Sequence, residues 1–203
     1  DAVLKELTDK KDLGIHSEMI ADGVVDLIEA GVVTNARKNF HNGKTVVTFL
    51  MGTKRLYDYA DDNPSVNLFP VNYVNNPYIA GQNDNLVAIN SAVQVDLFGQ
   101  VCAESVGYRQ ISGIGGQVDF VRAAAISKGG RAIIAMGSTA GKGKISKIVP
   151  ILDEGAAVTT SRCDVDYVVT EYGIAPLKGH TLKDRAKALI KIAHPDFRPD
   201  LIK

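Results

Sequence analysis

A glycine-rich loop over residues 112–120 (SGIGGQVDF) runs directly into residues 121–126 (VRAAAI), which we predict to be helical. Glycine lets backbone N–H groups approach a ligand closely and tolerates positive φ. The start of a helix adds unpaired N–H donors and a partial positive charge. The sequence therefore predicts a site for an anion, or for an oxygen that becomes negative during a reaction. The alternative is a tight turn that only packs the helix on a sheet.

The spacing of these glycines argues against a nucleotide-binding loop. Gly113, Gly115 and Gly116 lack the final glycine of the dinucleotide fingerprint, and no Gly-Lys-Ser/Thr sequence follows them.

A second group of reactive residues lies at positions 14–19 (GIHSEM). Glu18 has apolar neighbours in Ile15, Met19 and Ile20, which suit a carboxylate nucleophile that must be positioned and only partly hydrated. The alternative is a solvated glutamate at the start of a helix. We interpret His16 as a packing or hydrogen-bonding residue and leave it outside the catalytic set.

The composition is that of a soluble globular chain of one domain, or at most two, with 203 residues of which 45% are hydrophobic. The 23 Lys and Arg balance the 23 Asp and Glu, so net charge indicates neither a nucleic-acid nor a membrane partner. Cys102 and Cys163 have no metal-ligand or redox spacing, and the first residues do not resemble a signal peptide. We therefore expect reduced thiols, no structural zinc and a cytoplasmic protein.

The beginning of the chain, residues 1–8, looks like the middle of an amphipathic helix and has no initiator Met. We expect a fragment, the second part of a longer polypeptide. With no evident linker, we treat residues 1–203 as one domain.

Strands and helices are expected to alternate, which predicts an α/β domain with a mixed, mostly parallel sheet. Asp22 is expected to cap a helix that ends at Gly31, and Thr53 and Thr181 to open others. The expected helices cover residues 3–10, 23–30, 54–60, 121–126 and 182–192. The expected extended segments cover residues 13–16, 45–51, 66–68, 70–73, 86–95, 100–104, 131–136, 145–148, 157–161 and 167–170.

Six motifs appear in order along the chain: GIHSEM (14–19), NSA with VDLFGQ (90–100), GIGGQVDF (113–120), VTTSR (158–162), YVVTEYG (167–173) and AHPDFR (193–198). Together they resemble the C-terminal domain of the acetyl-CoA hydrolase/transferase family, nearest to its 4-hydroxybutyrate and butyrate CoA-transferase branch. The resemblance implies a CoA-transferase-like (NagB/RpiA-like) α/β fold, with a mostly parallel sheet flanked by helices. It also implies an N-terminal domain absent from this chain and an active site between the two domains.

The resemblance gives roles to four residues. Glu18 matches the glutamate that attacks an acyl-CoA and carries CoA as a glutamyl thioester. Gly115 and Gly116 match a loop near the thioester and the oxyanion, where one backbone donor is worth about 3 kcal/mol. Asn75 matches an asparagine close to the thioester end of CoA; the alternative is a turn residue before Pro77.

The resemblance further implies transfer of CoA between an acyl-CoA and a short-chain carboxylic acid such as acetate. CoA would be a substrate held as a covalent thioester, with no permanently bound cofactor, no metal, and a homo-oligomeric assembly. An acyl-CoA hydrolase using the same glutamate and a non-catalytic CoA-binding domain remain open. Lys142, Lys144 and Lys147 are interpreted as solvated, and Arg162 with Glu171 as an ion pair or a pocket wall.

Overall fold

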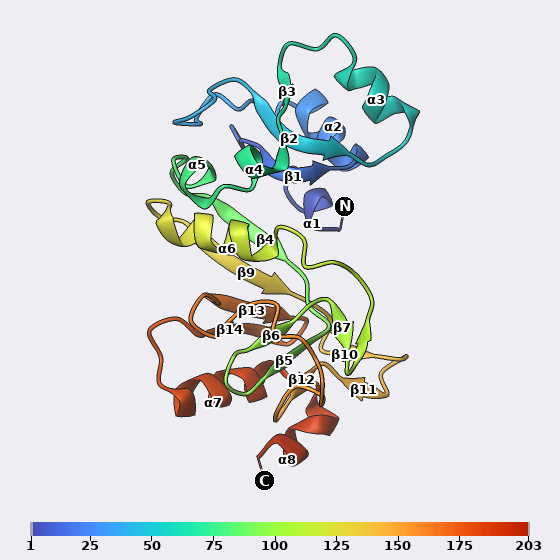
Figure 1. The fold of residues 1–203 in the computed structure, drawn as a ribbon, viewed down its shortest axis with the longest axis vertical. Helices are drawn as coiled ribbons and strands as arrows, with labels where there is room; N and C mark the ends of the chain where they lie inside the picture. Colours follow the sequence, from blue (N-terminus) through green and yellow to red (C-terminus); the bar gives the residue numbers. More distant parts are fainter. Residues whose placement is uncertain (1, 203) are drawn as a thin grey trace. The chain divides into compact units, whose positions relative to one another are not determined.

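The computed structural model describes residues 2–202, and Figure 1 shows the order of the elements. The chain divides into two compact units. Unit 1 comprises residues 1–84 and 126–128, and unit 2 comprises residues 85–125 and 129–203.

Unit 1 is built on a parallel three-stranded sheet of order β1-β2-β3. The strands are β1 (His16–Ile20), β2 (Thr45–Leu50) and β3 (Val66–Leu68). Its helices are α1 (Ala2–Lys5), α2 (Asp22–Glu29), α3 (Lys54–Ala60), α4 (Val71–Val74) and α5 (Pro77–Ala80). β-Branched residues of β2 and the apolar stripes of α2 and α3 form the core, with Val25, Val47 and Leu56 fully buried.

Unit 2 contains a mixed four-stranded sheet of order β14-β13-β9-β4. Strands β4 (Val87–Asn90), β9 (Arg131–Ala135) and β13 (Tyr167–Thr170) are parallel, and β14 (Gly173–Pro176) pairs antiparallel with β13. The longer helices are α6 (Gln117–Ile126) and α7 (Leu182–Ile192), followed by the 3₁₀ turn η1 (Pro195–Phe197) and α8 (Arg198–Leu201). The predicted α/β class with a mixed, mostly parallel sheet is confirmed.

Short strands complete unit 2. The sheet β12-β5-β6 joins β12 (Ile148–Val149), β5 (Gln94–Asp96) and β6 (Val101–Cys102). Two hairpins pair β7 (Ser105–Val106) with β8 (Arg109–Gln110), and β10 (Thr139–Ala140) with β11 (Ile145–Ser146).

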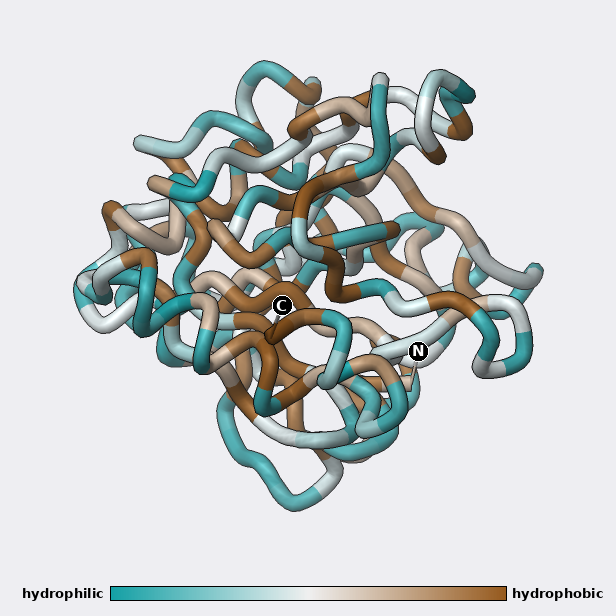
Figure 2. The backbone as a smooth tube through the Cα atoms, turned by 90° about the horizontal axis from the view of Figure 1, so that it is seen from below, coloured by the Kyte–Doolittle hydropathy of each residue, from teal (hydrophilic) through white to brown (hydrophobic). Residues whose placement is uncertain are grey.

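The two faces of the four-stranded sheet differ in how they are covered. Helices α6 and α7 pack on one face, against buried residues such as Ala132, Ile134 and Val168. On the other face, Val87 and Ile89 of β4 and Ile174 of β14 remain 47%, 43% and 65% exposed. We call this second surface the uncovered face. Its apolar side chains lie there because successive residues of a strand point to opposite faces of the sheet. Figure 2 shows hydrophobic and hydrophilic stretches alternating along the backbone.

Several predicted elements match closely, and others are wrong. α3 and β13 have the predicted bounds, and Thr181 caps α7 by accepting a hydrogen bond from the Asp184 N–H. Residues 70–73, expected to be extended, instead contribute most of the single-turn helix α4 behind Pro70. The expected strand 86–95 is two strands in different sheets, and residues 157–161 contribute only an isolated bridge at Thr160.

The start of the chain also differs from expectation. The predicted helix 3–10 is reduced to α1, and the first strand begins at His16 rather than ending there. Asp22 is the first residue of α2, not its cap, because its carboxylate accepts hydrogen bonds from Thr53 instead. Glu18 therefore lies in the middle of a β-strand.

Candidate active site

Glu18 projects from β1 on the same face as His16 and Ile20, because alternate strand residues share a face. Its carboxylate is half-buried, and Oε2 accepts a hydrogen bond of 3.0 Å from Nδ2 of Asn75. Asn75 follows α4 directly and is 8% exposed. The structure therefore brings together two of the four site residues expected from the sequence.

The other polar side-chain atom of Asn75 lacks a hydrogen bond within the part of the chain that the structure describes. Oδ1 is buried and has no hydrogen-bond partner among residues 2–202. A buried acceptor that stays unpaired costs free energy.

His16 precedes Glu18 by two residues and contacts the residue before Asn75. Its Nε2 lies 2.8 Å from the carbonyl oxygen of Val74. Because a carbonyl can only accept, Nε2 carries the proton. Burial lowers the pKa of His16 to about 4, so the ring is neutral at pH 7. His16 therefore serves as a hydrogen-bonding residue, as the sequence suggested.

The segment before β1 is held by a buried lysine that the sequence analysis missed. Nζ of Lys38 donates to the carbonyl oxygens of Ile15 and Lys44, and burial lowers the pKa of Lys38 to about 8. Asn35 accepts from the Ile15 N–H at 2.8 Å with a left-handed backbone, φ 57°. Nothing in their spacing indicates these contacts, because both residues lie in a loop.

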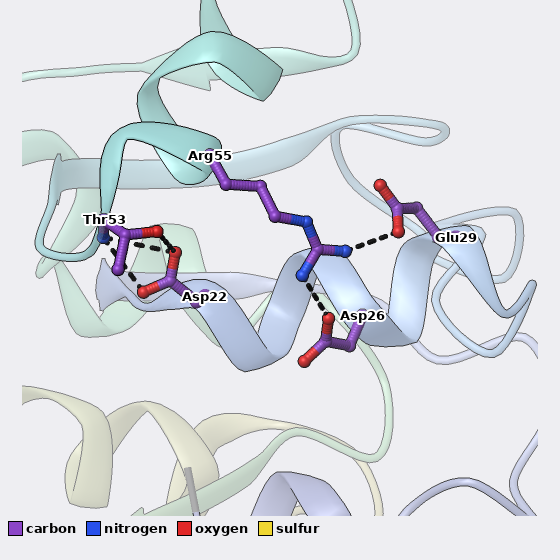
Figure 3. A network of polar contacts seen from close by, with 5 residues as sticks. All are labelled: Asp22, Asp26, Glu29, Thr53 and Arg55. Atoms are coloured by element: carbon purple, nitrogen blue, oxygen red, sulfur yellow. Dashed lines mark hydrogen bonds and ion pairs between the residues drawn. The ribbon is translucent and has the colours of Figure 1, made fainter.

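Polar contacts also fix the helices that follow β1 and β2 (Figure 3). The backbone N–H and the hydroxyl of Thr53 both donate to Asp22, and these bonds lower the pKa of that carboxyl group. Arg55 of α3 bridges Asp26 and Glu29 of α2. Exposed ion pairs add little stability. Their geometry nevertheless joins α2 to α3.

The glycine loop belongs to unit 2. Gly115 is exposed with φ 60° and Gly116 is buried. A helix does follow the glycines, but α6 begins at Gln117, so residues 117–120, expected to belong to the loop, are helical. The Gln117 side chain donates to Thr160 Oγ1 at 3.0 Å, and Gln110 donates to the Ser112 carbonyl at 2.8 Å. These contacts hold both ends of the loop.

Other charged candidates have different partners from those expected. No ion pair joins Arg162 to Glu171 within the described residues. Glu171 accepts instead from the N–H and hydroxyl of Ser138, at 2.8 and 2.6 Å. Burial raises the pKa of Glu171, but the hydrogen bonds to its carboxylate, with that of the Ser138 hydroxyl first, and the nearby His194 together lower it, so the net shift is downward. Lys147 is partly buried, which lowers its pKa.

No group of three or more His, Cys, Asp or Glu side chains within residues 2–202 could hold a metal ion. Nor does the described part of the chain contain a helix of the length and hydropathy needed to cross a membrane.

Comparison with known proteins gives a consistent result. The chain is 66% identical to 4-hydroxybutyrate coenzyme A transferase of Clostridium kluyveri, and the match covers 100% of the chain and 47% of that protein. It is 56% identical to succinyl-CoA:cyclohexane-1-carboxylate CoA transferase of Geobacter metallireducens, over 99% of the chain and 46% of that protein. The chain thus spans about half the length of the curated relatives that it matches.

Solved structures agree with this result. RipA from Yersinia pestis matches with a TM-score of 0.94 and 50% identity, over 99% of this chain and 45% of that one. A 4-hydroxybutyrate CoA-transferase from Porphyromonas gingivalis matches with a TM-score of 0.85 and 48% identity, over 99% and 47%.

The family model for the acetyl-CoA hydrolase/transferase C-terminal domain matches residues 52–203. Asn75, Gly115 and Gly116 lie inside this range, whereas Glu18 precedes it and is covered by the pairwise matches. With the predicted motifs, the α/β fold and these matches in agreement, the chain belongs to the acetyl-CoA hydrolase/transferase family.

Proposed function

We propose that this chain carries the nucleophile of a CoA-transferase, Glu18, which moves CoA from an acyl-CoA to a short-chain carboxylate such as acetate. The observation that carries the proposal is the Glu18 carboxylate on β1, half-buried and held at 3.0 Å by the amide of Asn75. A carboxylate in this setting is oriented and partly shielded from water, as a nucleophile of this type requires.

The reaction divides one difficult exchange into easier steps. The Glu18 carboxylate attacks the acyl-CoA carbonyl carbon, the C–S bond breaks and CoA leaves as a thiolate, which leaves a mixed anhydride between Glu18 and the acyl group. The thiolate then attacks the Glu18 carbonyl, releasing the first acid as a carboxylate and leaving glutamyl-CoA. A second carboxylate reverses these steps and departs as its acyl-CoA. Neither ATP nor a proton shuttle is needed for this exchange.

Asn75 and the glycine loop have different roles in this reaction. Asn75 holds Glu18 Oε2, which leaves Oε1 as the attacking oxygen. Gly115 and Gly116 remain the predicted source of backbone N–H groups for the oxyanion and for CoA. Their conformation and the adjoining start of α6 support that role.

The substrate class is supported by the names of the relatives. Proteins that transfer CoA to or from 4-hydroxybutyrate and butyrate match at 66%, 51% and 50% identity. An acetyl-CoA hydrolase of Kluyveromyces lactis matches at 31%. We therefore propose an enzyme of the 4-hydroxybutyrate or butyryl-CoA:acetate type.

The organisation of the whole protein is also part of the proposal. We propose that this chain is the C-terminal domain, that an N-terminal domain completes it, and that the enzyme is a cytoplasmic homo-oligomer. Relatives about twice as long support the second domain, and the free thiols of Cys102 and Cys163 are consistent with the cytoplasm.

The test is covalent capture by the full-length polypeptide. It is incubated with butyryl-CoA, digested at mildly acidic pH, and analysed by peptide mass spectrometry. We expect a CoA adduct on the peptide containing Glu18 that added acetate discharges. Glu18→Ala should abolish adduct and turnover. Glu6→Ala, which changes an exposed glutamate of the same unit, should leave both intact.

The other outcomes decide between the alternatives. An adduct that water discharges as fast as acetate does would make the protein a hydrolase. Binding of CoA without an adduct or exchange would make it a CoA-binding protein. Turnover retained in Glu18→Ala would overturn the assignment of the nucleophile.

A further inference from the structure

His16 and Glu18 occupy adjacent positions on one face of β1, and each bonds one of two consecutive residues at the end of α4. Nε2 of His16 lies 2.8 Å from the Val74 carbonyl oxygen, and Glu18 Oε2 lies 3.0 Å from Asn75 Nδ2. The two contacts run side by side. The histidine therefore fixes the backbone directly before the asparagine that holds the carboxylate.

Helix α4 needs such an anchor. It has only four residues, and one helical turn does not form by itself in water. After Asn75 the chain turns at once into α5, another four-residue helix, whose cap is Asn76. Asn75 thus lies between two single turns, and contacts with the sheet must determine its position.

Burial makes the histidine contact specific. His16 is 8% exposed and Val74 is fully buried, so water does not replace the bond readily. A second α4 contact, from Tyr73 Oη to His41 Nε2 at 2.8 Å, lies two residues before Asn75 rather than next to it. His16 is the closer anchor.

We propose that His16 is a positioning residue that holds Asn75 within hydrogen-bond reach of Glu18 through the Val74 carbonyl. The role differs from that of a general acid, because His16 donates its N–H to the backbone. The effect on turnover rests on the proposed function of Glu18, whereas the effect on geometry does not.

The test compares His16→Leu, which removes the donor, with His16→Gln, which keeps an N–H within reach of Val74. In the full-length enzyme we expect His16→Leu to lower kcat by about 10- to 100-fold, with KM for acyl-CoA changed by less than about twofold. We expect His16→Gln to recover activity to within about threefold.

A double-mutant cycle separates positioning from general stability. If His16 acts through Asn75, adding His16→Leu to Asn75→Ala should cost less than about twofold further. An equal loss in both backgrounds would overturn the proposal. If His16→Leu does not fold, His16→Gln decides alone. A folded His16→Gln enzyme as slow as Asn75→Ala would overturn the proposal, and near-normal activity would support it.

A crystal structure of the His16 variants provides a readout that does not depend on turnover. We expect the bond between Asn75 and Glu18 to be lost in His16→Leu and kept in His16→Gln. An unchanged bond in His16→Leu would overturn the positioning role. Failure of the proposed function would appear separately, as turnover retained in Glu18→Ala.

Discussion

Asn75 donates its side-chain amide to the carboxylate of Glu18, a residue 57 positions earlier in the chain. The bond joins the turn after α4 to the middle of β1. It also gives the carboxylate one defined orientation, with one oxygen bound and one available.

Removing this bond should slow the reaction without unfolding the protein. A hydrogen bond to a charged group is worth roughly 1.5–3 kcal/mol, so we expect Asn75→Ala to lower kcat by about 10- to 100-fold. Asn75→Asp should be slower still, because it replaces the donor with a like charge. Steady-state CoA exchange measures both. Asn76→Ala, which removes only the cap of α5, is the control and should retain more activity.

The buried His16 makes folding stability depend on pH. Its pKa lies at about 4 in the folded state against 6.5 when unfolded, so the unfolded chain binds the proton first as pH falls. Stability from this group is complete above pH 6.5 and is lost between pH 6.5 and 4, by on the order of 3 kcal/mol. Urea unfolding at pH 7 and pH 4.5 measures this loss.

Other groups titrate in the same interval, including His41, whose pKa is lowered by burial and by Lys38. The comparison with His16→Gln isolates the contribution of His16. If the variant loses as much stability between the two pH values as the native chain, the assignment is wrong.

Gly52 lies where a side chain would collide with two fixed neighbours. A Cβ there would come within 2.7 Å of Asp22 Oδ2 and 2.8 Å of Leu56 Cδ2. Leu56 is fully buried and Asp22 is bonded to Thr53, so neither moves freely. We expect Gly52→Ala to lower the free energy of unfolding by about 1–3 kcal/mol. Gly137→Ala, whose nearest contact would be an ordinary 3.6 Å, should change it much less.

The glycine loop can be tested by a matched pair of substitutions. Gly115 has φ 60°, which costs an alanine about 1–2 kcal/mol, whereas Gly113 does not have a positive φ. A Cβ would meet nothing within 4 Å at either position, so the pair differs in backbone conformation and not in crowding. If the loop supplies N–H groups to the reaction, Gly115→Ala should lower kcat at least about tenfold while Gly113→Ala stays near the native rate. Equal rates for the two variants would contradict a role of the loop in the reaction and would favour a turn that only packs the helix on the sheet.

Part of this architecture could be read from the sequence because its information is local. Residues 45–50 are largely β-branched or apolar, Thr53 and Thr181 precede clear helical patterns, and the glycines at 113–116 precede a helix, although it begins at Gln117 rather than at the expected residue 121. In these places neighbouring residues alone determine the element.

The errors arose where distant contacts decide the structure. Residues 71–74 form a helical turn because α4 packs on β1 and β2, and residues 86–95 divide because β4 and β5 pair with different strands. The contacts of Glu18 with Asn75 and of Lys38 with Ile15 join positions that no periodicity relates. The family resemblance suggested Glu18 and Asn75 separately as site residues, and only the structure shows the bond between them.

The uncovered face of the four-stranded sheet has a consequence for handling the protein. Val87, Ile89 and Ile174 expose apolar surface that α6 and α7 do not shield. Such surface favours self-association, and salt does not screen apolar contacts as it screens charges. With a formal net charge of zero, the 203-residue chain has little repulsion to oppose this tendency. We therefore expect the chain to self-associate as its concentration rises. Light scattering should increase at temperatures well below that of thermal unfolding.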